Sequence, residues 1–461
     1  MITEGQNISE VQSRLNPQEL GGEMHALMAE LYPICRSITG DGFRRTLERL
    51  RREIPLEVRE VPSGTKVFDW TVPREWNIRD AYVKNSRGER LIDFQEHNLH
   101  VVNYSVPIHR KMQLGELKKH LHTLPDQPDL IPYRTSYYAE NWGFCLPHRD
   151  LLRMEEGEYE VEIDASLEDG HLTFGEYFIP GDAPEEVLIS CHACHPSLCN
   201  DNLSGVAVAT YLAKHLTGAA LRYSYRFLFI PGTIGSITWL SLNEERVSEI
   251  RHGLVLTCVG DRGGLTYKRS RRGDAEVDRA VQHVLEHSGE RHEILAFSPY
   301  GYDERQYCSP AFNLAVGCLM RTPHGQFPEY HTSADNLDLV DPAKLADTVA
   351  KCLAIFSVLE NNRAYLNRNP KCEPQLGRRG LYSAMGGGDV KQLELAMLWV
   401  LNLSDGSSKL LDIAERAGLG FDLIKRAADL LEQHDLLTEV PILSQSAEPE
   451  ERVATWTKSK P

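Results

Sequence analysis

One stretch, residues 187–216, does most to limit the folds that this chain can adopt. Residues 187–189 are an apolar run, which is typical of a buried strand. Residues 200–202, Asn-Asp-Asn, can cap a helix whose apolar positions continue to Leu216. The turn between strand and helix carries two histidines and three cysteines, His192, His195, Cys191, Cys194 and Cys199. Since ligands bind at the carboxyl ends of strands in open α/β sheets, we expect a ligand or metal site here.

The region from residue 160 to residue 370 repeats this change from strand to helix. Strands are predicted at 187–191, 223–229, 253–259, 294–297 and 314–320, and helices at 205–216, 234–242, 275–286 and 342–360. The alternation predicts a three-layer α/β/α domain, whose mixed, mostly parallel sheet is covered by helices on both faces. Residues 1–60, with short helices predicted at 24–32 and 43–52, are assigned to the same domain.

Residues 61–159 differ from the rest in composition. They are rich in Trp, Tyr, Val and Pro, with short alternating runs separated by polar turns. This pattern predicts an inserted β-rich domain. Two interpretations of the insert stay open: a lid or module that shapes a substrate site, and a module for packing or for homo-oligomer formation.

A winged-helix domain is predicted at residues 380–445, after a linker at 363–388 that is rich in Gly, Pro and Asn. Its helices are expected at 390–403, 410–417 and 423–434. Winged helices often read DNA. Residues 421–435 carry a net charge of −2, from Lys425 and Arg426 against Asp422, Asp429, Glu432 and Asp435. Because a helix that docks on phosphates should be basic, we expect this module to contact protein rather than DNA.

The composition of the chain limits which partners and which cellular location we expect for it. Its 461 residues carry a formal net charge of −16, which argues against nucleic acid as a main partner. Ten cysteines in a chain of this length do not make a disulfide framework, which suits a reduced environment. Residues 1–16 are polar, and no apolar run is long enough to span a bilayer. We therefore expect a cytoplasmic protein with no signal peptide and no membrane contact.

A second segment far downstream supports a metal site. Residues 328–336 read Pro-Glu-Tyr-His-Thr-Ser-Ala-Asp-Asn. With the turn described above, this segment resembles the zinc aminopeptidase superfamily, which includes the co-catalytic zinc aminopeptidases and the glutaminyl cyclases. There, an H-x-D strand end, a D-N-x-S-G helix start and a late Y-H-T-x-x-D supply metal ligands. The resemblance implies that His192, Asp201 and His331 bind zinc, and it places Cys194 at the Asp of H-x-D.

A closer likeness is to aminopeptidase-like proteins with an inserted domain of unknown function and a C-terminal winged helix. It is carried by ordered matches over most of the chain, at 36–42, 68–73, 142–145, 192–205, 303–310 and 321–325. This likeness implies a zinc domain in residues 1–60 and 160–370, with the insert at 61–159 and the winged helix at 380–445. It also implies hydrolysis of a small peptide or amide.

Zinc-dependent amide hydrolysis needs groups beyond the three ligands. One group must take a proton from the attacking water and return it to the leaving amine. Candidates for this catalytic role are Asp303, Glu304 and His195, and candidates for substrate contacts are Tyr302, Arg305 and Tyr330. Asp335 is a candidate to hold a ligating histidine in its tautomer. For Asp303, Glu304 and Asp335, a structural salt bridge is an equally open interpretation.

The sequence departs from the superfamily pattern at two positions. Gly232 stands where the two-metal aminopeptidases place the Glu that serves as general base. Thr257 stands at about the position of a late Asp ligand. These departures favour one metal ion over two and predict a site short of its usual base. Gly232→Glu is then expected to raise activity, unless Gly232 is simply a tight turn.

Other functions stay open. A catalytically impaired relative that binds a ligand or partner is favoured by the missing Glu, and a DNA-binding regulator is disfavoured by charge. Two histidines and a carboxylate also describe non-haem iron sites, although those usually lie on jelly-roll sheets. A structural zinc held by the cysteines of the 191–199 turn with His195 is a further alternative, at spacings tighter than usual.

Overall fold

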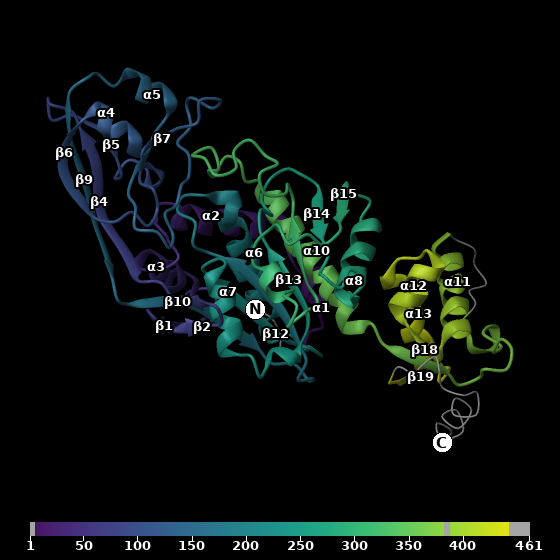
Figure 1. The fold of residues 1–461 in the computed structure, drawn as a ribbon. Coiled ribbons are helices and arrows are strands. Elements are labelled where there is room, and N and C mark those ends of the chain that lie inside the picture. Colours follow the sequence, from purple (N-terminus) through teal and green to yellow (C-terminus); the bar gives the residue numbers. More distant parts are fainter. Residues whose placement is uncertain (1–4, 382–387, 442–461) are drawn as a thin grey trace. The chain divides into compact units, whose positions relative to one another are not determined.

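The computed structural model describes residues 5–381 and 388–441, which divide into two compact units (Figure 1). The larger unit contains residues 1–278 and 291–353, and the smaller unit contains residues 279–290 and 354–461. Among the described helices, none is both long enough and apolar enough to cross a membrane.

The larger unit is built on an eight-stranded mixed sheet with the order β1-β10-β12-β11-β13-β16-β14-β15. The strands are β1 (Glu57–Pro62), β10 (His171–Ile179), β11 (Glu186–His192), β12 (Ser224–Ile230), β13 (Ile250–Leu256), β14 (Leu265–Lys268), β15 (His292–Leu295) and β16 (Val316–Met320). β11 is parallel to both of its neighbours, β12 and β13. Every residue of β11 and β12 is buried, because both faces of the sheet are covered. The predicted α/β class is confirmed.

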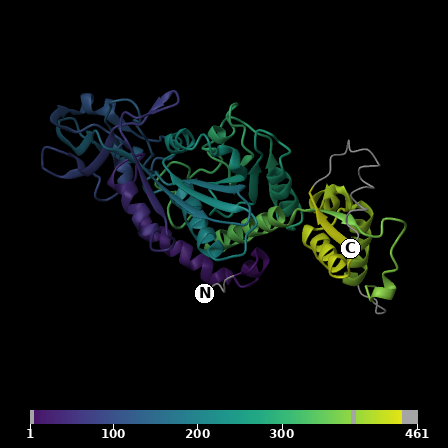
Figure 2. The ribbon, with the colours of Figure 1, turned by 90° about the horizontal axis from the view of Figure 1, so that it is seen from below.

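Helices supply the layers on the sheet. α3 (Asp41–Leu50), α6 (Gly205–Leu216) and α7 (Ile234–Leu242) contact the strands, and α2 (Pro17–Leu31) contacts α6. α8 (Glu276–Glu286) and α10 (Pro342–Asn361) each have residues in both units. α6 is buried along most of its length because it packs on the central strands and also contacts α2, which runs along the outside of this layer (Figure 2, purple). α2 starts earlier than predicted, since Asn16 accepts hydrogen bonds from the first turn and Pro17 suits the first helical position.

The insert folds on a second, antiparallel sheet of four strands in the order β5-β4-β9-β6. These are β4 (Glu75–Lys84), β5 (Arg90–Asp93), β6 (Ile108–Gln113) and β9 (Glu158–Glu168). Buried and half-buried residues alternate along β9, which is the mark of a sheet that is packed on one face. Three of these strands lie within residues 61–159, and β9 continues nine residues past the end predicted for the insert, to Glu168.

The smaller unit contains the predicted winged helix. Its helices are α11 (Gly388–Leu403), α12 (Leu410–Ala417) and α13 (Phe421–Gln433), and its strands are β17 (Ala364–Asn367), β18 (Asp405–Lys409) and β19 (Leu437–Val440). One prediction was wrong: the segment from residue 363, interpreted as a linker, begins with β17, the central strand of this sheet. The strand ends at Asn367, and Arg368 and Asn369 follow it with the polar character of a loop, so the four-residue strand was not recognised in the sequence.

We expect the full-length protein to bind random duplex DNA only weakly at physiological salt. On α13, Lys425 Nζ already lies 2.6 Å from Asp429 Oδ2, so the helix offers little free positive charge for phosphates. Fluorescence anisotropy with a labelled duplex should give a dissociation constant weaker than about 1 µM. A double variant, Asp422→Lys with Asp429→Lys, reverses the charge of the helix and serves as the matched control. Submicromolar, salt-sensitive binding by the unmodified protein would contradict this expectation.

Candidate metal centre at the carboxyl edge of the sheet

The candidate centre lies where β11 ends and α6 begins, as the sequence predicts. β11 ends at His192, and Cys199–Ser204 forms an irregular helical segment that leads into α6. The side-chain amide of Asn202 holds this turn in place. Its Nδ2 donates to the carbonyl oxygens of His192 at 3.2 Å and Leu256 at 3.0 Å, and its Oδ1 accepts from Gly205 N at 3.2 Å. One side chain thus joins the ends of β11 and β13 to the start of α6.

Asp335 fixes the main chain that carries Asp201. Its Oδ1 accepts a hydrogen bond from Asn200 N at 2.5 Å, and its Oδ2 accepts one from Asp201 N at 3.0 Å. Burial raises the pKa of Asp335 to about 8, and these backbone N–H groups act in the opposite direction. The carboxylate predicted to orient a histidine therefore orients the backbone of the Asp201 turn.

The carboxylate of Asp201 faces three imidazoles. His192 Nε2 lies 2.9 Å from Asp201 Oδ1, and His331 Nε2 lies 3.0 Å from Asp201 Oδ2. His195 Nδ1 lies 3.7 Å from Asp201 Oδ1. Asp201 and His192 are fully buried, whereas about a third of the His331 side chain is exposed. The fold thus brings together the three residues predicted as ligands and adds His195.

Electrostatics at this cluster favour an ionised Asp201 carboxylate and a neutral His195 ring. Burial acts to raise the pKa of Asp201, but the facing rings of His195, His192 and His331 hold that pKa well below its ordinary value. Burial also lowers the pKa of His195 well below its ordinary value. A neutral imidazole carries the free lone pair that a metal requires.

The donor chemistry of the cluster fits a metal ion. Ligand atoms of His192, His195 and Asp201 lie within 4.8 Å of one another. His195 Nδ1 is buried, faces Asp201 and has no hydrogen-bond partner among the described residues, so the cluster holds a polar atom that an ion or its bound water could contact. Histidine nitrogen and carboxylate oxygen are ordinary zinc ligands. By contrast, no described group with metal-ligand spacing contains a cysteine of the 191–199 turn, so the structural-zinc alternative gains no support.

Tyr302 occupies the space in which a side chain at position 232 would lie. A Cβ built on Gly232 would stand 1.9 Å from Tyr302 Cε1, far closer than atoms can approach. The Tyr302 ring lies against His192 with their centroids 3.8 Å apart and their planes tilted by 37°, and its hydroxyl lies 3.8 Å from Cys194 Sγ. Burial raises the pKa of the Tyr302 phenol well above its ordinary value, so the phenol stays protonated. The expectation that Gly232→Glu alone would restore a base conflicts with this packing.

The two acids after Tyr302 have different partners. Glu304 is fully buried, lies 2.5 Å from Lys268 Nζ and accepts hydrogen bonds from Tyr302 N at 3.1 and 3.2 Å. Asp303 Oδ1 accepts from Ser236 Oγ at 2.7 Å, and burial raises the pKa of Asp303 to about 7. Glu304 therefore has the structural ion pair that the sequence left open.

The two remaining residues predicted to contact substrate, Tyr330 and Arg305, differ in their surroundings. Tyr330 stacks on His331 with their ring centroids 4.0 Å apart, which places it at the exposed side of the cluster. Arg305 lies exposed on α9 (Glu304–Tyr307). Tyr330 is thus adjacent to the candidate ligands, whereas for Arg305 the structure shows exposure alone.

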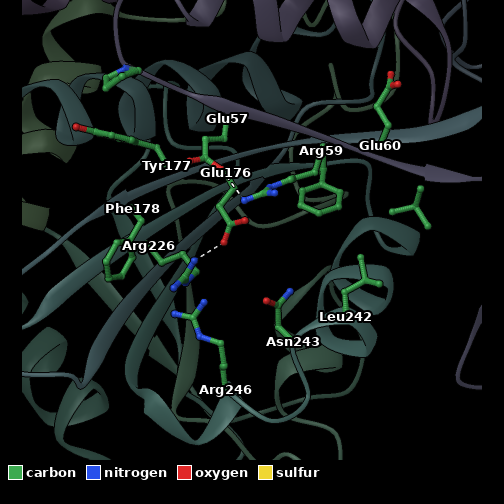
Figure 3. A pocket seen from close by; sticks show the side chains of 13 residues that line it. Glu57, Arg59, Glu60, Glu176, Tyr177, Phe178, Arg226, Leu242, Asn243 and Arg246 are labelled. Atoms are coloured by element: carbon green, nitrogen blue, oxygen red, sulfur yellow. Dashed lines mark hydrogen bonds and ion pairs between the residues drawn. The ribbon is translucent and has the colours of Figure 1, made fainter.

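A cavity of about 600 Å³ lies elsewhere, at the outer strands β1, β10 and β12 (Figure 3). Its charged side chains pair with one another: Arg226 contacts Glu176, and Arg59 Nη2 lies 2.6 Å from Glu57 Oε2. Because these charges are already balanced and the lining contains no residue of the centre, this cavity adds nothing to the candidate chemistry.

Comparison with known proteins identifies the family. Residues 25–362 match the family described as a domain of unknown function, DUF4910, and residues 363–439 match a winged helix-turn-helix family. The chain belongs to the DUF4910 family. A Clostridium acetobutylicum protein, named for polysaccharide biosynthesis and an aminopeptidase-like domain, is 57% identical over 423 residues, which cover 92% of this chain and 97% of that protein.

Solved structures agree with this assignment. A crystal structure from Clostridium acetobutylicum, described as that of a peptidase, has a TM-score of 0.90 and 55% identity, and the match covers 94% of this DUF4910 chain and all of that one. A zinc aminopeptidase from Bacillus subtilis has a TM-score of 0.54 at 10% identity, over 73% of this chain and 94% of that one. At that identity the second likeness shows the fold alone, which is aminopeptidase-like.

The insert of this DUF4910 protein forms part of the wall of the centre, which the sequence did not reveal. Tyr133 N donates to His331 O at 2.8 Å, and Ser333 N donates to Ile131 O at 2.9 Å, so the two segments pair like a short strand ladder. The Tyr133 ring meets the rings of His195 and His331 edge-on, each with centroids 5.1 Å apart. This arrangement favours the site-shaping interpretation of the insert.

We expect Gly232 and Tyr302 to behave as one unit in a double-mutant cycle. Gly232→Ala alone forces the buried Tyr302 ring to move and should cost roughly 1–3 kcal/mol in the free energy of unfolding. In a Tyr302→Ala background the same change should cost much less, because the ring is gone. Denaturant unfolding of the four proteins measures the coupling. Strictly additive effects would show that the ring does not fill the space beside Gly232.

Proposed function

We propose that this chain is a zinc-dependent, aminopeptidase-like hydrolase that acts on a small peptide or amide. The observation that supports it best is the buried Asp201 carboxylate facing imidazole nitrogens at the carboxyl edge of the sheet. His192, Asp201 and His331 would hold the ion, which when bound polarises an amide carbonyl and lowers the pKa of the attacking water. That all described cysteines are free thiols fits the cytoplasmic location we propose.

His195 is the best of the three candidates for the proton-accepting group. Its Nδ1 faces Asp201 and has no hydrogen-bond partner among the described residues, and its lowered pKa keeps the ring neutral. Glu304 is paired with Lys268 and accepts hydrogen bonds from Tyr302 N, so its carboxylate already has partners. Asp303 Oδ2 is also buried without a hydrogen-bond partner among the described residues, but its other oxygen accepts from Ser236, and it is His195 that faces Asp201. We therefore assign the base role to His195.

The substrate side of the centre is built from aromatic groups. Tyr330 stacks on His331, Tyr302 lies tilted against His192, and Tyr133 of the insert meets His331 edge-on. A protonated Tyr302 phenol can donate a hydrogen bond to a carbonyl oxygen in which negative charge develops. Because a relative is named for polysaccharide biosynthesis, amide-bearing sugars belong in a substrate screen beside aminoacyl anilides.

A second function, ligand binding without efficient turnover, is favoured by one observation. The place of the usual carboxylate base is filled by the Tyr302 ring, which cannot accept a proton at neutral pH. Loss of general-base catalysis typically lowers a rate by about 10²–10⁴-fold. A protein that binds zinc and an amide but shows only trace turnover in the screen would match this second function.

His331→Ala should lower the zinc content by about one ion per chain, because it removes one of about three protein ligands. Inductively coupled plasma mass spectrometry on the purified protein measures this directly. His215→Ala, on α6 and outside the cluster, is the matched control and should keep the full zinc content. A folded His331→Ala protein with undiminished zinc would rule out the proposed ligand set.

A further inference from the structure

Exposed aromatic side chains gather at a short hairpin of the insert. β2 (Lys66–Val67) and β3 (Trp70–Thr71) pair to form this hairpin, which contacts α7 (Figure 1). The Trp70 ring lies against that of Tyr138, with their centroids 5.3 Å apart and their planes at 63°. Trp70 is 43% exposed and Tyr138 is 53% exposed. We call these two rings the aromatic platform. Exposed apolar surface of this kind often marks a ligand-binding groove.

The backbone presents these rings to solvent at the expense of strain. Phe68, at the tip of the hairpin, has a φ of +56°, and Tyr138 has a φ of +65°. Tyr104, a third aromatic residue nearby, has a φ of +74°. Such left-handed values are uncommon for bulky residues and persist where function requires them. Because the side chains of Phe68 and Tyr138 are exposed, burial of their rings does not account for these conformations.

A cavity of about 390 Å³ adjoins the platform. Its lining includes Tyr138, the buried Tyr104 and the charged Arg74, Glu140 and Asp169. A volume of this size suits one small ligand. Arg74 pairs with Glu140, and both side chains are exposed. The site therefore combines aromatic surface with charged groups that remain open to a ligand.

This combination favours a sugar ring over an apolar side chain. An apolar group placed in the cavity would cover Arg74, Glu140 and Asp169 without offering them hydrogen bonds, which is costly. A pyranose ring has C–H groups on its faces and hydroxyls around its edge. Its C–H groups, polarised by the ring oxygens, are attracted to the negative face of an aromatic ring. Its hydroxyls can both accept from a guanidinium and donate to a carboxylate.

The platform is connected to the wall of the candidate centre. Tyr138 and Tyr137 have ring centroids 6.4 Å apart, and the hydroxyl of Tyr137 lies 3.0 Å from that of Tyr133. Tyr133 in turn meets the rings of His195 and His331. A ligand held on the platform is thus bound by the same part of the insert that forms the wall of the centre.

We propose that Trp70, Tyr138 and the adjoining cavity bind the pyranose ring of a saccharide. This inference deepens the proposed function and rests on it in one respect, the substrate class: an amide carried on a sugar. The binding of the sugar itself needs no metal ion, because neither Trp70 nor Tyr138 is a candidate ligand. The two residues determine specificity and take no part in proton transfer.

Saccharide binding by the full-length protein tests the site. The probes are neutral trisaccharides of glucose, N-acetylglucosamine, mannose and galactose, titrated by saturation-transfer difference NMR. At least one of them should bind, and Trp70→Ala and Tyr138→Ala should each weaken that binding about tenfold, because each removes one ring face. Tyr138→Phe keeps the ring and should keep most of the affinity. Phe178→Ala is the matched control, since Phe178 is an exposed aromatic residue at the other cavity, and its binding should be unchanged.

Two other occupants of the platform give different results. If benzyl alcohol binds in a manner that depends on Trp70 while no trisaccharide binds, the platform takes an apolar side chain and the inference is wrong. If sedimentation shows an oligomer that Trp70→Ala dissociates, a second copy of the chain covers the platform, and the inference is again wrong. Circular dichroism checks that the variants fold, which their exposed positions favour.

The outcomes separate this inference from the proposed function. Saccharide binding that is lost in Trp70→Ala and Tyr138→Ala but retained in His331→Ala and after zinc removal upholds the site. Binding that all variants retain, or no binding of any trisaccharide, overturns it and leaves the zinc ligands to their own test. If the site binds a saccharide but no amide-bearing sugar is hydrolysed, the saccharide site stands, and the assigned substrate class falls with the proposed hydrolase.

Discussion

The buried charge of Asp201 is the constraint on which the rest of the candidate centre depends. Burying an unpaired carboxylate in a protein interior costs roughly several kcal/mol of folding free energy, so its surroundings must supply compensating partners. Here Asp335 and Asn202 fix the backbone around it, and imidazole nitrogens face both of its oxygens. These contacts come from β11, from the start of α6 and from the segment after β16. The buried charge of Asp201 is therefore balanced only when these three parts of the chain meet at the edge of the sheet.

Beside that charge, the exchange of a carboxylate for a phenol changes the chemistry without changing the fold. The Tyr302 ring fills the volume beside Gly232, so the strand end keeps its packing although the expected side chain is missing. A carboxylate there would accept a proton, whereas the phenol, with its raised pKa, can only donate one. In the hydrolase proposed above, Tyr302 would therefore stabilise charge on the reacting carbonyl at the position where the resemblance implies a general base. Proton transfer then has to use a group on another side, and the unpartnered Nδ1 of His195 is placed for it.

The sequence predicted the parts of the centre that follow from strand and helix ends, and it could not predict those that depend on packing. His192, Asp201 and His331 meet as expected, because each lies beside an element whose period was readable. Tyr302 was named for substrate contact, but only coordinates show that its ring lies against Gly232. Neither Cys258 nor His324 was named as a candidate ligand from the sequence. Only the pairing of β13 with β16 brings their ligand atoms within 4.8 Å of each other and of Asp201. The strand β17 escaped notice because four residues carry too little pattern to outweigh the loop-like composition after them.

The docking of the insert has a consequence for the exposed ligand. His331 lies in a loop, with a left-handed backbone that is costly on its own, by about 1–3 kcal/mol. Its carbonyl accepts from Tyr133 N, and the next residues pair with Ile131, so the insert holds this backbone in the conformation that points the imidazole at Asp201. The sheet supplies the buried candidate ligands, and the insert contacts the backbone of the exposed candidate, His331. A sheet domain without the insert would keep His192 and Asp201 in position but would leave His331 free to relax, which is why the insert belongs to the centre and not only to its surroundings.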